Sequence, residues 1–483
     1  MAKFRSARSD YSRTENFAGG EAFKKSPELE LVSLLLTSFV KDKFYEKEGD
    51  QLDRLSELVK SFKDKRFPAK AGIYARNEFG MRSITHALAG EIVNQVKGED
   101  WTKRFVSKVV RRPDDILEIF GYYLGKFGKP IPNSLKKGSA SAIKKFDAYQ
   151  LAKYRGTRSN VKMVDIFRLV HVKPDKDQAN LFKDLVEGNL KSTNTWEAKL
   201  SKAGQEAKSY EEKRKLKEKA WADLILEGKI GYFALLRNLR NIHEQSDKVI
   251  DKALEMLTDR KRIKKSLVLP FRFVTAYYEI SKVSGSQKIL DAIDEALEIS
   301  LDNVPKFDGD TLVVLDGSGS MMGFGEDGKS PIEVGGMFAS VLIKSNKADF
   351  ITFSDNAQYM NMSSRGSVMQ MTKTLVDSAR AGGTNFHAIF NTANRKYDRI
   401  IILSDMQGWI GYNTPSEMFN SYKRRMNANP HVYSFDLQGY GTLQFPEHQV
   451  YAIAGFSDKV FDIMKVLEKN KRALIKEIDK VIL

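Results

Sequence analysis

The chain has 483 residues, of which 42% are hydrophobic, so it is long enough for roughly two to four domains. It has no cysteine, which excludes disulfides, thiolate zinc sites and cysteine nucleophiles. Its first ten residues are charged, and no apolar run reaches the roughly 20 residues that span a bilayer, so we expect an intracellular, cytoplasmic protein.

The positive charge is unevenly distributed. The formal net charge is +17, yet residues 306–483 carry 20 Lys and Arg against 19 Asp and Glu, so nearly all the excess lies in residues 1–305. Such a field suits a polyanion, because phosphate contacts with Lys and Arg release counterions and dominate affinity. The alternative is a basic surface that serves only solubility.

Residues 20–305 predict one helix after another. Apolar residues recur at three- and four-residue spacing, as from Leu29 to Phe39 and from Leu52 to Phe62. Short breakers such as Gly49-Asp50 separate these runs about every 20 residues, which indicates stacked helical pairs of the HEAT-like kind. The stretch 196–226 has charges of alternating sign and predicts a solvated helix.

The pattern changes after residues 302–305 to short β-rich runs that alternate with helices. We therefore expect an all-helical domain at residues 1–305 and a doubly wound, mostly parallel α/β domain at residues 306–483. The expected strands are 311–315, 349–353, 357–362 (at the edge), 399–403, 432–437 and 449–453, and the expected helices are 332–345, 368–379, 386–395, 416–426 and 457–468.

Three short motifs lie where such a sheet binds ligands, at the carboxyl ends of its strands. They are Asp316-Gly-Ser318-Gly-Ser320, Gly382-Gly-Thr384-Asn385 and Ser404-Asp405-Met406. Asp316, Ser318, Ser320, Thr384 and Asp405 offer only oxygen ligands, which suits Mg²⁺, and neutral hydroxyls leave the ion able to bind a partner's carboxylate or phosphate. The alternative for a single such motif is a Gly/Ser turn with a helix cap.

These motifs are similar to those of a known domain family. Residues 310–406 resemble a von Willebrand factor A domain with a metal-ion-dependent adhesion site, and all five oxygen donors match that family's positions without substitution. The resemblance implies a site that binds an acidic protein or ligand and does not catalyse.

The helical part resembles the TROVE module of Ro autoantigen proteins in the stretches Arg76–Ser83, Lys153–Arg155, Asp165–Pro174 and Ala234–Asn241. The resemblance implies a ring of HEAT-like helices closed by the A domain. Its outer basic surface would bind small structured Y RNAs, and its central hole would accept single-stranded 3′ ends of misfolded RNA. In bacterial relatives the Y RNA would tether an exoribonuclease or another RNA-processing partner.

One segment concentrates the candidate RNA-binding residues beside Tyr149 and Tyr154, since Arg and Lys pair with phosphates and Arg stacks on bases. The cluster comprises Arg111, Arg112, Lys136, Lys137, Lys144, Lys145, Lys153, Arg155, Arg158 and Lys162. The resemblance places Lys153, Arg155, Arg158 and His171 on or near the Y-RNA-contacting segment. His171 ends an apolar helical run, so a structural role is its alternative. Arg237 and Arg240 either bind RNA in the hole or form structural ion pairs.

We expect an RNA-binding protein for RNA quality control or processing, and not an enzyme. A Mg²⁺-dependent phosphatase or nuclease needs a general acid or base near the metal, and Ser318 stands where a second acid would follow Asp316. The remaining alternative is a metal-dependent protein-interaction module without specific RNA binding.

Overall fold

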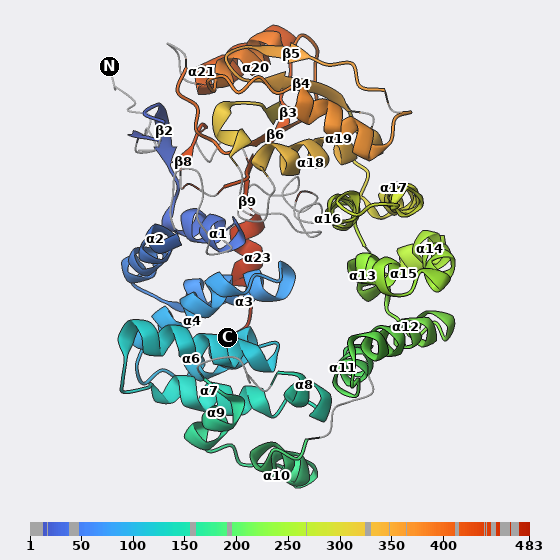
Figure 1. Cartoon of the computed structure of the whole chain (residues 1–483). Coiled ribbons are helices and arrows are strands. Elements are labelled where there is room, and N and C mark those ends of the chain that lie inside the picture. Colours follow the sequence, from blue (N-terminus) through green and yellow to red (C-terminus); the bar gives the residue numbers. More distant parts are fainter. Residues whose placement is uncertain are drawn as a thin grey trace.

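The computed structural model of the whole chain is shown in Figure 1. It describes residues 13–16, 18–37, 48–154, 161–190, 196–266, 268–323, 330–346, 348–363, 365–410, 415–438, 440, 442–445, 451–454, 464 and 473–483. None of the helices in these stretches is long and apolar enough to cross a membrane.

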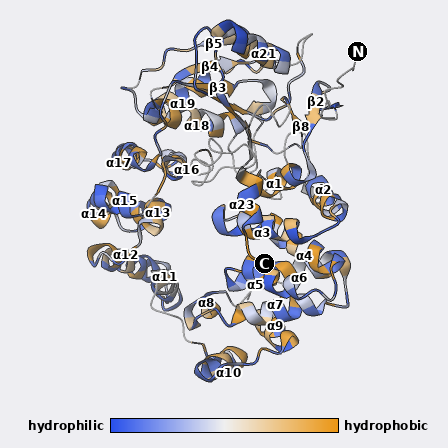
Figure 2. Cartoon of the chain, turned by 180° about the vertical axis from the view of Figure 1, so that it is seen from behind, coloured by the Kyte–Doolittle hydropathy of each residue, from blue (hydrophilic) through white to orange (hydrophobic). Residues whose placement is uncertain are grey.

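The first part of the chain folds into helices whose apolar faces pack on their neighbours. In α5, for example, Trp101, Phe105, Val106 and Val109 are buried at the spacing expected for one helix face. Figure 2 shows hydrophobic and hydrophilic residues mixed along these helices. Their bounds are α1 (Pro27–Thr37), α2 (Glu48–Ser61), α3 (Arg66–Glu78), α4 (Ser83–Gln95), α5 (Asp100–Val109), α6 (Pro113–Phe127), α7 (Asn133–Ile143), α8 (Ala148–Lys153), α9 (Met163–Val170), α10 (Ala179–Glu187), α11 (Trp196–Gln205), α12 (Tyr210–Leu226), α13 (Tyr232–Gln245), α14 (Ile250–Thr258), α15 (Arg260–Ser266), α16 (Pro270–Ser281) and α17 (Gln287–Ser300).

The helices are arranged as a ring that the C-terminal domain closes. Neighbours such as α3 and α4, α4 and α6, and α5 and α7 pack together. In Figure 1 they descend from α1 to α10 along one side and return from α11 to α17 along the other. Both Figure 1 and Figure 2 place α13 toward the inner side of the ring and α14 toward the outside. The predicted ring of HEAT-like helices is thus confirmed.

The C-terminal domain is a six-stranded sheet in the order β5-β4-β3-β6-β7-β9. All neighbouring strands are parallel except β4 and β5, which confirms the predicted doubly wound sheet and its edge strand. The strands are β3 (Thr311–Asp316), β4 (Asp349–Phe353), β5 (Ala357–Tyr359), β6 (Arg399–Ser404), β7 (His431–Asp436) and β9 (Tyr451–Ala454), and the helices are α18 (Pro331–Asn346), α19 (Val368–Asp377), α20 (Phe386–Thr392) and α21 (Pro415–Met426).

Alternate residues of the central strands belong to two cores. Val313 and Leu315 join a core that includes Phe338 of α18 and continues into the helical ring. Leu312 and Val314 face the other way, into a core that includes Phe390 of α20. This period of two buries both faces of β3, which explains its uninterrupted apolar sequence.

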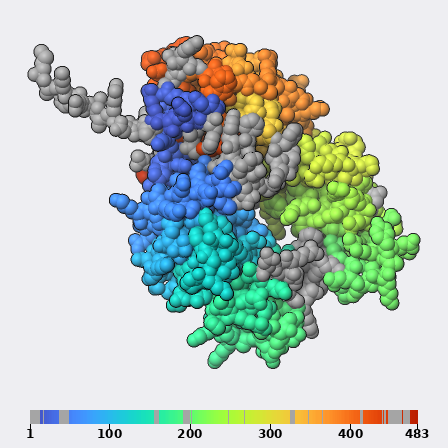
Figure 3. Space-filling view, turned by 60° about the vertical axis from the view of Figure 1, so that its left-hand side comes forward, coloured from blue at the N-terminus to red at the C-terminus, as the bar shows by residue number. Residues whose placement is uncertain are grey.

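The two ends of the chain cross between the domains. Strands β1 (Arg13–Glu15) and β2 (Glu21–Lys24) form a hairpin, and β2 pairs with β8 (Thr442–Leu443). Figure 3 shows the surface of the hairpin directly against that of the C-terminal domain. At the other end, α23 (Ala473–Asp479) packs on α3, where Lys70 donates a 2.6 Å hydrogen bond to the carbonyl of Asp479.

These crossings correct two expectations. The prediction of consecutive helices from residue 20 onward is wrong at residues 21–24. These residues are extended because β2 hydrogen-bonds to both β1 and β8. Strand β8 itself was not expected, because two residues carry no readable alternation. The predicted helix 457–468 lies, except for Met464, outside the described residues.

Candidate metal site and RNA-binding surfaces

The sheet topology brings the three oxygen-rich loops together. Strands β3 and β6 are parallel neighbours, with Leu315 opposite Leu403. Asp316 is the last residue of β3, Ser404 is the last residue of β6, and Asp405 follows it. Both strands point their carboxyl ends at the same edge, so the two carboxylates emerge side by side.

Hydrogen bonds tie the loops to one another. The Gly319 amide donates to the Gly382 carbonyl at 2.9 Å, which joins the first loop to the second. The Trp409 amide donates to the Thr384 carbonyl at 3.1 Å, which joins the second loop to the third. The Ser404 hydroxyl donates to Oδ2 of Asp316 at 2.5 Å, which joins the third loop to the first. These bonds therefore hold together the three loops that carry the five predicted ligands.

The five side chains form a buried, all-oxygen set. Asp316 and Asp405 are fully buried, and Ser318, Ser320 and Thr384 are buried as well. The two serine hydroxyl oxygens lie 3.4 Å apart. Oδ2 of Asp405 is buried and accepts no hydrogen bond from any residue that the structure describes. A buried carboxylate oxygen without a partner is costly, and a cation bound beside it would remove that cost.

Burial raises the pKa of both carboxyl groups, and the charge of Asp316 raises that of Asp405 further. The raised pKa of Asp316 reports its burial in a low-dielectric site, and the raised pKa of Asp405 reports in addition the negative charge of Asp316 beside it. Hard oxygen donors with two negative charges match the preferences of Mg²⁺, which also keeps some water ligands. The residues therefore fit the cation that the sequence predicts.

Sequence reasoning missed a third carboxylate at this edge. Asp436, the last residue of β7, is buried and contributes to the raised pKa of Asp405. Its charge is neutralised by Lys25 from the N-terminal segment, whose Nζ lies 2.7 Å from Oδ2 of Asp436. The sequence could not predict this contact, because two residues that are 411 positions apart leave no local pattern.

The N-terminal hairpin also supports the third loop. Nδ2 of Asn16 donates a 2.5 Å hydrogen bond to the carbonyl of Gly408. A Cβ at Gly20 would lie 2.1 Å from that carbonyl oxygen, so only glycine allows this approach. The adjacent Trp409 remains 55% exposed. The loop after Asp405 is thus held by residues from the other end of the chain.

Several predicted RNA-binding residues are engaged within the protein. Arg112 makes a two-bond contact with Asp114 at 2.9 and 2.7 Å and lies over the ring of Tyr154. Lys144 pairs with Asp175 at 2.8 Å. Lys145 donates to the Ser107 carbonyl, and burial lowers its pKa. The contacts of Arg111 with Asn77 and of Lys153 with Tyr149 are exposed hydrogen bonds of 3.1 and 3.0 Å.

The other members of the cluster are less constrained. The side chains of Lys136, Lys137 and Lys162 make no hydrogen bond or ion pair with a described residue. His171 ends α9 in the left-handed conformation, with φ of 50°, and its side chain is exposed and not in the core. Arg155 and Arg158 lie outside the described residues.

The two candidates on α13 differ in their contacts. Arg240 forms an ion pair with Glu244 at 2.8 Å, the structural alternative that the sequence left open. Arg237 is exposed and has no ion-pair partner in the described part of the chain. One turn before it, Phe233 is 43% exposed. Arg237 and the exposed ring of Phe233 therefore lie on the same face of α13, which we call the inner stripe.

Comparison with known protein families shows to which family this chain belongs. Its sequence matches the TROVE domain over residues 38–218 and 188–295, and the Ro60 vWA domain over residues 311–467. The chain belongs to the TROVE-domain Ro family. This is a family of RNA-binding proteins that form ribonucleoproteins.

Two relatives place this TROVE-family chain among known proteins. The crystal structure of the Deinococcus radiodurans RO (RSR) protein matches with a TM-score of 0.65 and 16% identity, over 92% of this chain and 100% of that one, which shows the shared fold. Telomerase protein component 1 of Mus musculus is 22% identical over 296 residues, 45% of this chain. The match covers 11% of that relative, so the chain spans about a tenth of its length.

Proposed function

We propose that this TROVE-family chain is the protein of a Ro-type ribonucleoprotein. It binds a small structured, Y RNA-like RNA on the outer basic surface of its helical ring and single-stranded ends of misfolded RNA on the inner side. The proposal rests chiefly on the concentration of basic residues in the helical part, joined to membership of an RNA-binding family. Its role would be RNA quality control or processing.

The outer surface provides the groups that structured RNA requires. Lys136, Lys137 and Lys162 keep their ammonium groups available for phosphates. The exposed His171 offers a ring at the end of α9. Lys153 and Arg112 stand beside Tyr154, where a base could stack. An exoribonuclease or another RNA-processing enzyme would join the complex through this RNA.

The inner side suits a single strand. Phe233 offers a ring on which an unpaired base can stack, and Arg237 offers a charge for the adjoining phosphate. This stripe supports the assignment of unpaired 3′ ends to the inner side of the ring.

Asp316, Ser318, Ser320, Thr384 and Asp405 would hold a divalent cation, most simply Mg²⁺. The ion would supply a Lewis-acidic position for a carboxylate or phosphate oxygen of a partner. The exposed Trp409 beside this edge favours a second, compatible function, the capture of an acidic protein or ligand, because an exposed tryptophan is a common anchor of interfaces.

The proposal is tested by purifying the protein from its host under mild conditions and sequencing the RNA crosslinked to it. A discrete small structured RNA, crosslinked within residues 110–175, is the expected result. Folded protein that enriches no RNA at low salt would contradict the proposal and leave metal-dependent protein capture as the function.

A further inference from the structure

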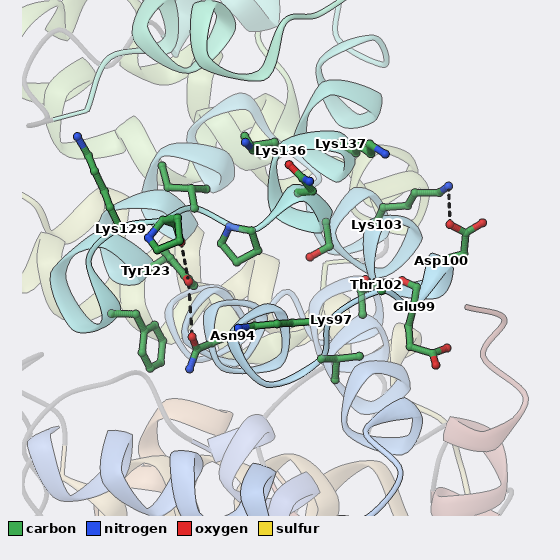
Figure 4. A pocket seen from close by; sticks show the side chains of 18 residues that line it. Asn94, Lys97, Glu99, Asp100, Thr102, Lys103, Tyr123, Lys129, Lys136 and Lys137 are labelled. Atoms are coloured by element: carbon green, nitrogen blue, oxygen red, sulfur yellow. Dashed lines mark hydrogen bonds and ion pairs between the residues drawn. The ribbon is translucent and has the colours of Figure 1, made fainter.

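A cavity of about 650 Å³ opens on the helical part, between the connection from α4 to α5 and the connection from α6 to α7 (Figure 4). Its volume lies within the roughly 300–1,000 Å³ of sites that enclose small molecules. The two connections approach each other because α4 packs on α6 and α5 packs on α7. The cavity is therefore built by the repeat packing and not by one mobile loop.

The lining of the cavity is strongly basic. Five lysines and two acids contribute to it, namely Lys97, Lys103, Lys129, Lys136, Lys137, Glu99 and Asp100. Both acids already have cationic neighbours, since Asp100 pairs with Lys103 at 3.0 Å and Glu99 lies 3.8 Å from Arg66. The side chains of Lys97 and Lys136 make no hydrogen bond or ion pair with any described residue. Figure 4 shows them on opposite sides of the cavity.

Part of the remaining wall is apolar. Tyr123 is buried, its ring lies 5.2 Å from that of Phe127, and its hydroxyl donates to the carbonyl of Pro130 at 3.3 Å. Ile131 and Pro132 continue this wall. A flat apolar surface beside unpaired ammonium groups is the combination that a nucleotide requires, because its base is flat and its phosphate is anionic.

We propose that this cavity holds one nucleotide of a bound RNA, with its phosphate near Lys97 and Lys136 and its base against the wall of Tyr123, Phe127 and Ile131. The inference rests on the RNA binding of the proposed function and adds a defined site to it. The phosphate is either a phosphodiester within the strand or a terminal phosphate, and both share the same chemistry.

The experiment uses the full chain and a fluorescent single-stranded RNA, prepared with either a 5′-phosphate or a 5′-hydroxyl. Binding is followed by fluorescence anisotropy over a series of salt concentrations. The charge variant is K97Q/K136Q, and the matched control is K373Q/K396Q, which removes two exposed charges from the C-terminal domain. A third variant, N133W, fills the cavity from an exposed lining residue without changing charge. Circular dichroism verifies that each variant is folded.

In K97Q/K136Q we expect weaker binding and a log–log salt slope about 0.7 smaller in magnitude than that of the wild type, because both lysines face one phosphate and each phosphate contact with a single strand contributes about 0.7. The control variant should keep the wild-type slope, and N133W should weaken binding. If the effect requires the 5′-phosphate, the nucleotide is a strand terminus. If it does not, the nucleotide is internal.

Wild-type binding with equal slopes for K97Q/K136Q and the control would overturn the inference and leave the proposed function standing. So would unimpaired binding by N133W, because RNA would then cross the surface without entering the cavity. Absence of RNA binding by the wild type would instead overturn the proposed function itself.

Discussion

Arg76 donates a 2.7 Å hydrogen bond from Nη2 to Oδ2 of Asp115, and both side chains are buried. Asp115 also accepts hydrogen bonds from Arg82 at 3.1 and 3.2 Å and from the backbone amides of Arg111 and Arg112 at the start of α6. The Ro-like stretch Arg76–Ser83 thus fixes α3 and α4 on α6. The side chains of Arg76 and Arg82 are therefore engaged within the fold.

The Asp115 network predicts a large loss of stability in D115N. This change removes the buried charge that faces Arg76, and an unpaired buried charge costs about 3 kcal/mol or more. Urea unfolding at neutral pH should therefore show a lower free energy of unfolding by about that amount. D165N, which changes an exposed carboxylate on α9, is the control and should unfold like the wild type.

The same network predicts a pH dependence. Burial alone would raise the pKa of Asp115, but His86 and Arg76 more than offset it, and the pKa is lowered. Because the folded pKa lies below the unfolded value of about 3.9, the contribution of Asp115 is fully present above that pH and is lost as the pH falls below it. The difference in unfolding free energy between the wild type and D115N should thus shrink below about pH 4. A constant difference down to pH 2.5 would mean that the carboxylate is not the stabilising group.

The pair Lys25 and Asp436 predicts how the two ends of the ring are held together. K25M leaves Asp436 buried at the metal edge without its cation, which should cost about 3 kcal/mol in urea unfolding. K25M/D436L replaces both charges by apolar side chains and should recover most of the loss, because the desolvation cost disappears with the charges. A double variant as unstable as K25M would show that the hairpin docks for another reason.

The proposed metal site predicts a cation-dependent gain of stability. Mg²⁺ that binds only the folded state should raise the Tm of the wild-type chain, and EDTA should reverse the rise. In D316N one of the two carboxylates is lost, and the Mg²⁺-dependent rise should disappear while RNA affinity is kept, because the metal site and the RNA surfaces lie on different domains. D308N, at an exposed position, should respond to Mg²⁺ like the wild type. An equal rise in D316N would exclude Asp316 as a ligand.

The sequence predicted those parts of the fold that local patterns specify. The apolar run Thr311–Leu315 predicted β3, because a strand buried on both faces needs no polar position. The five oxygen donors were predicted from motifs at strand ends, and the sheet brings their loops together. In both cases the information lies within a few residues or in the order of strands.

Contacts between residues that are far apart in the sequence could not be predicted from local patterns. Asn16 hydrogen-bonds to Gly408, and Lys25 neutralises Asp436. Nothing in the sequence around Asn16 or Lys25 distinguishes either of them from an ordinary surface residue. The basic cluster shows the same limit, because counting charges cannot distinguish Arg112, engaged by Asp114, from Lys136, which has no ion pair with a described residue. Charge composition predicts that a surface binds RNA, and only the pairing of each side chain indicates which residues are available.

The difference between paired and unpaired basic side chains leads to a specific prediction for α13. Arg237 and Arg240 are both exposed and have the same charge, but among the described residues only Arg240 has an ion-pair partner, which is Glu244. If single-stranded RNA binds the inner stripe, R237Q should weaken binding and reduce the salt slope by about 0.7, and R240Q should do so less. F233A should cost about 1–3 kcal/mol of binding through the loss of one stacked base. Anisotropy with a single strand and with a blunt hairpin of equal charge separates the two surfaces, since the hairpin offers no unpaired end. Equal losses from R237Q and R240Q would mean that the ring attracts RNA by its overall field and that the pairing of individual arginines does not select the contact.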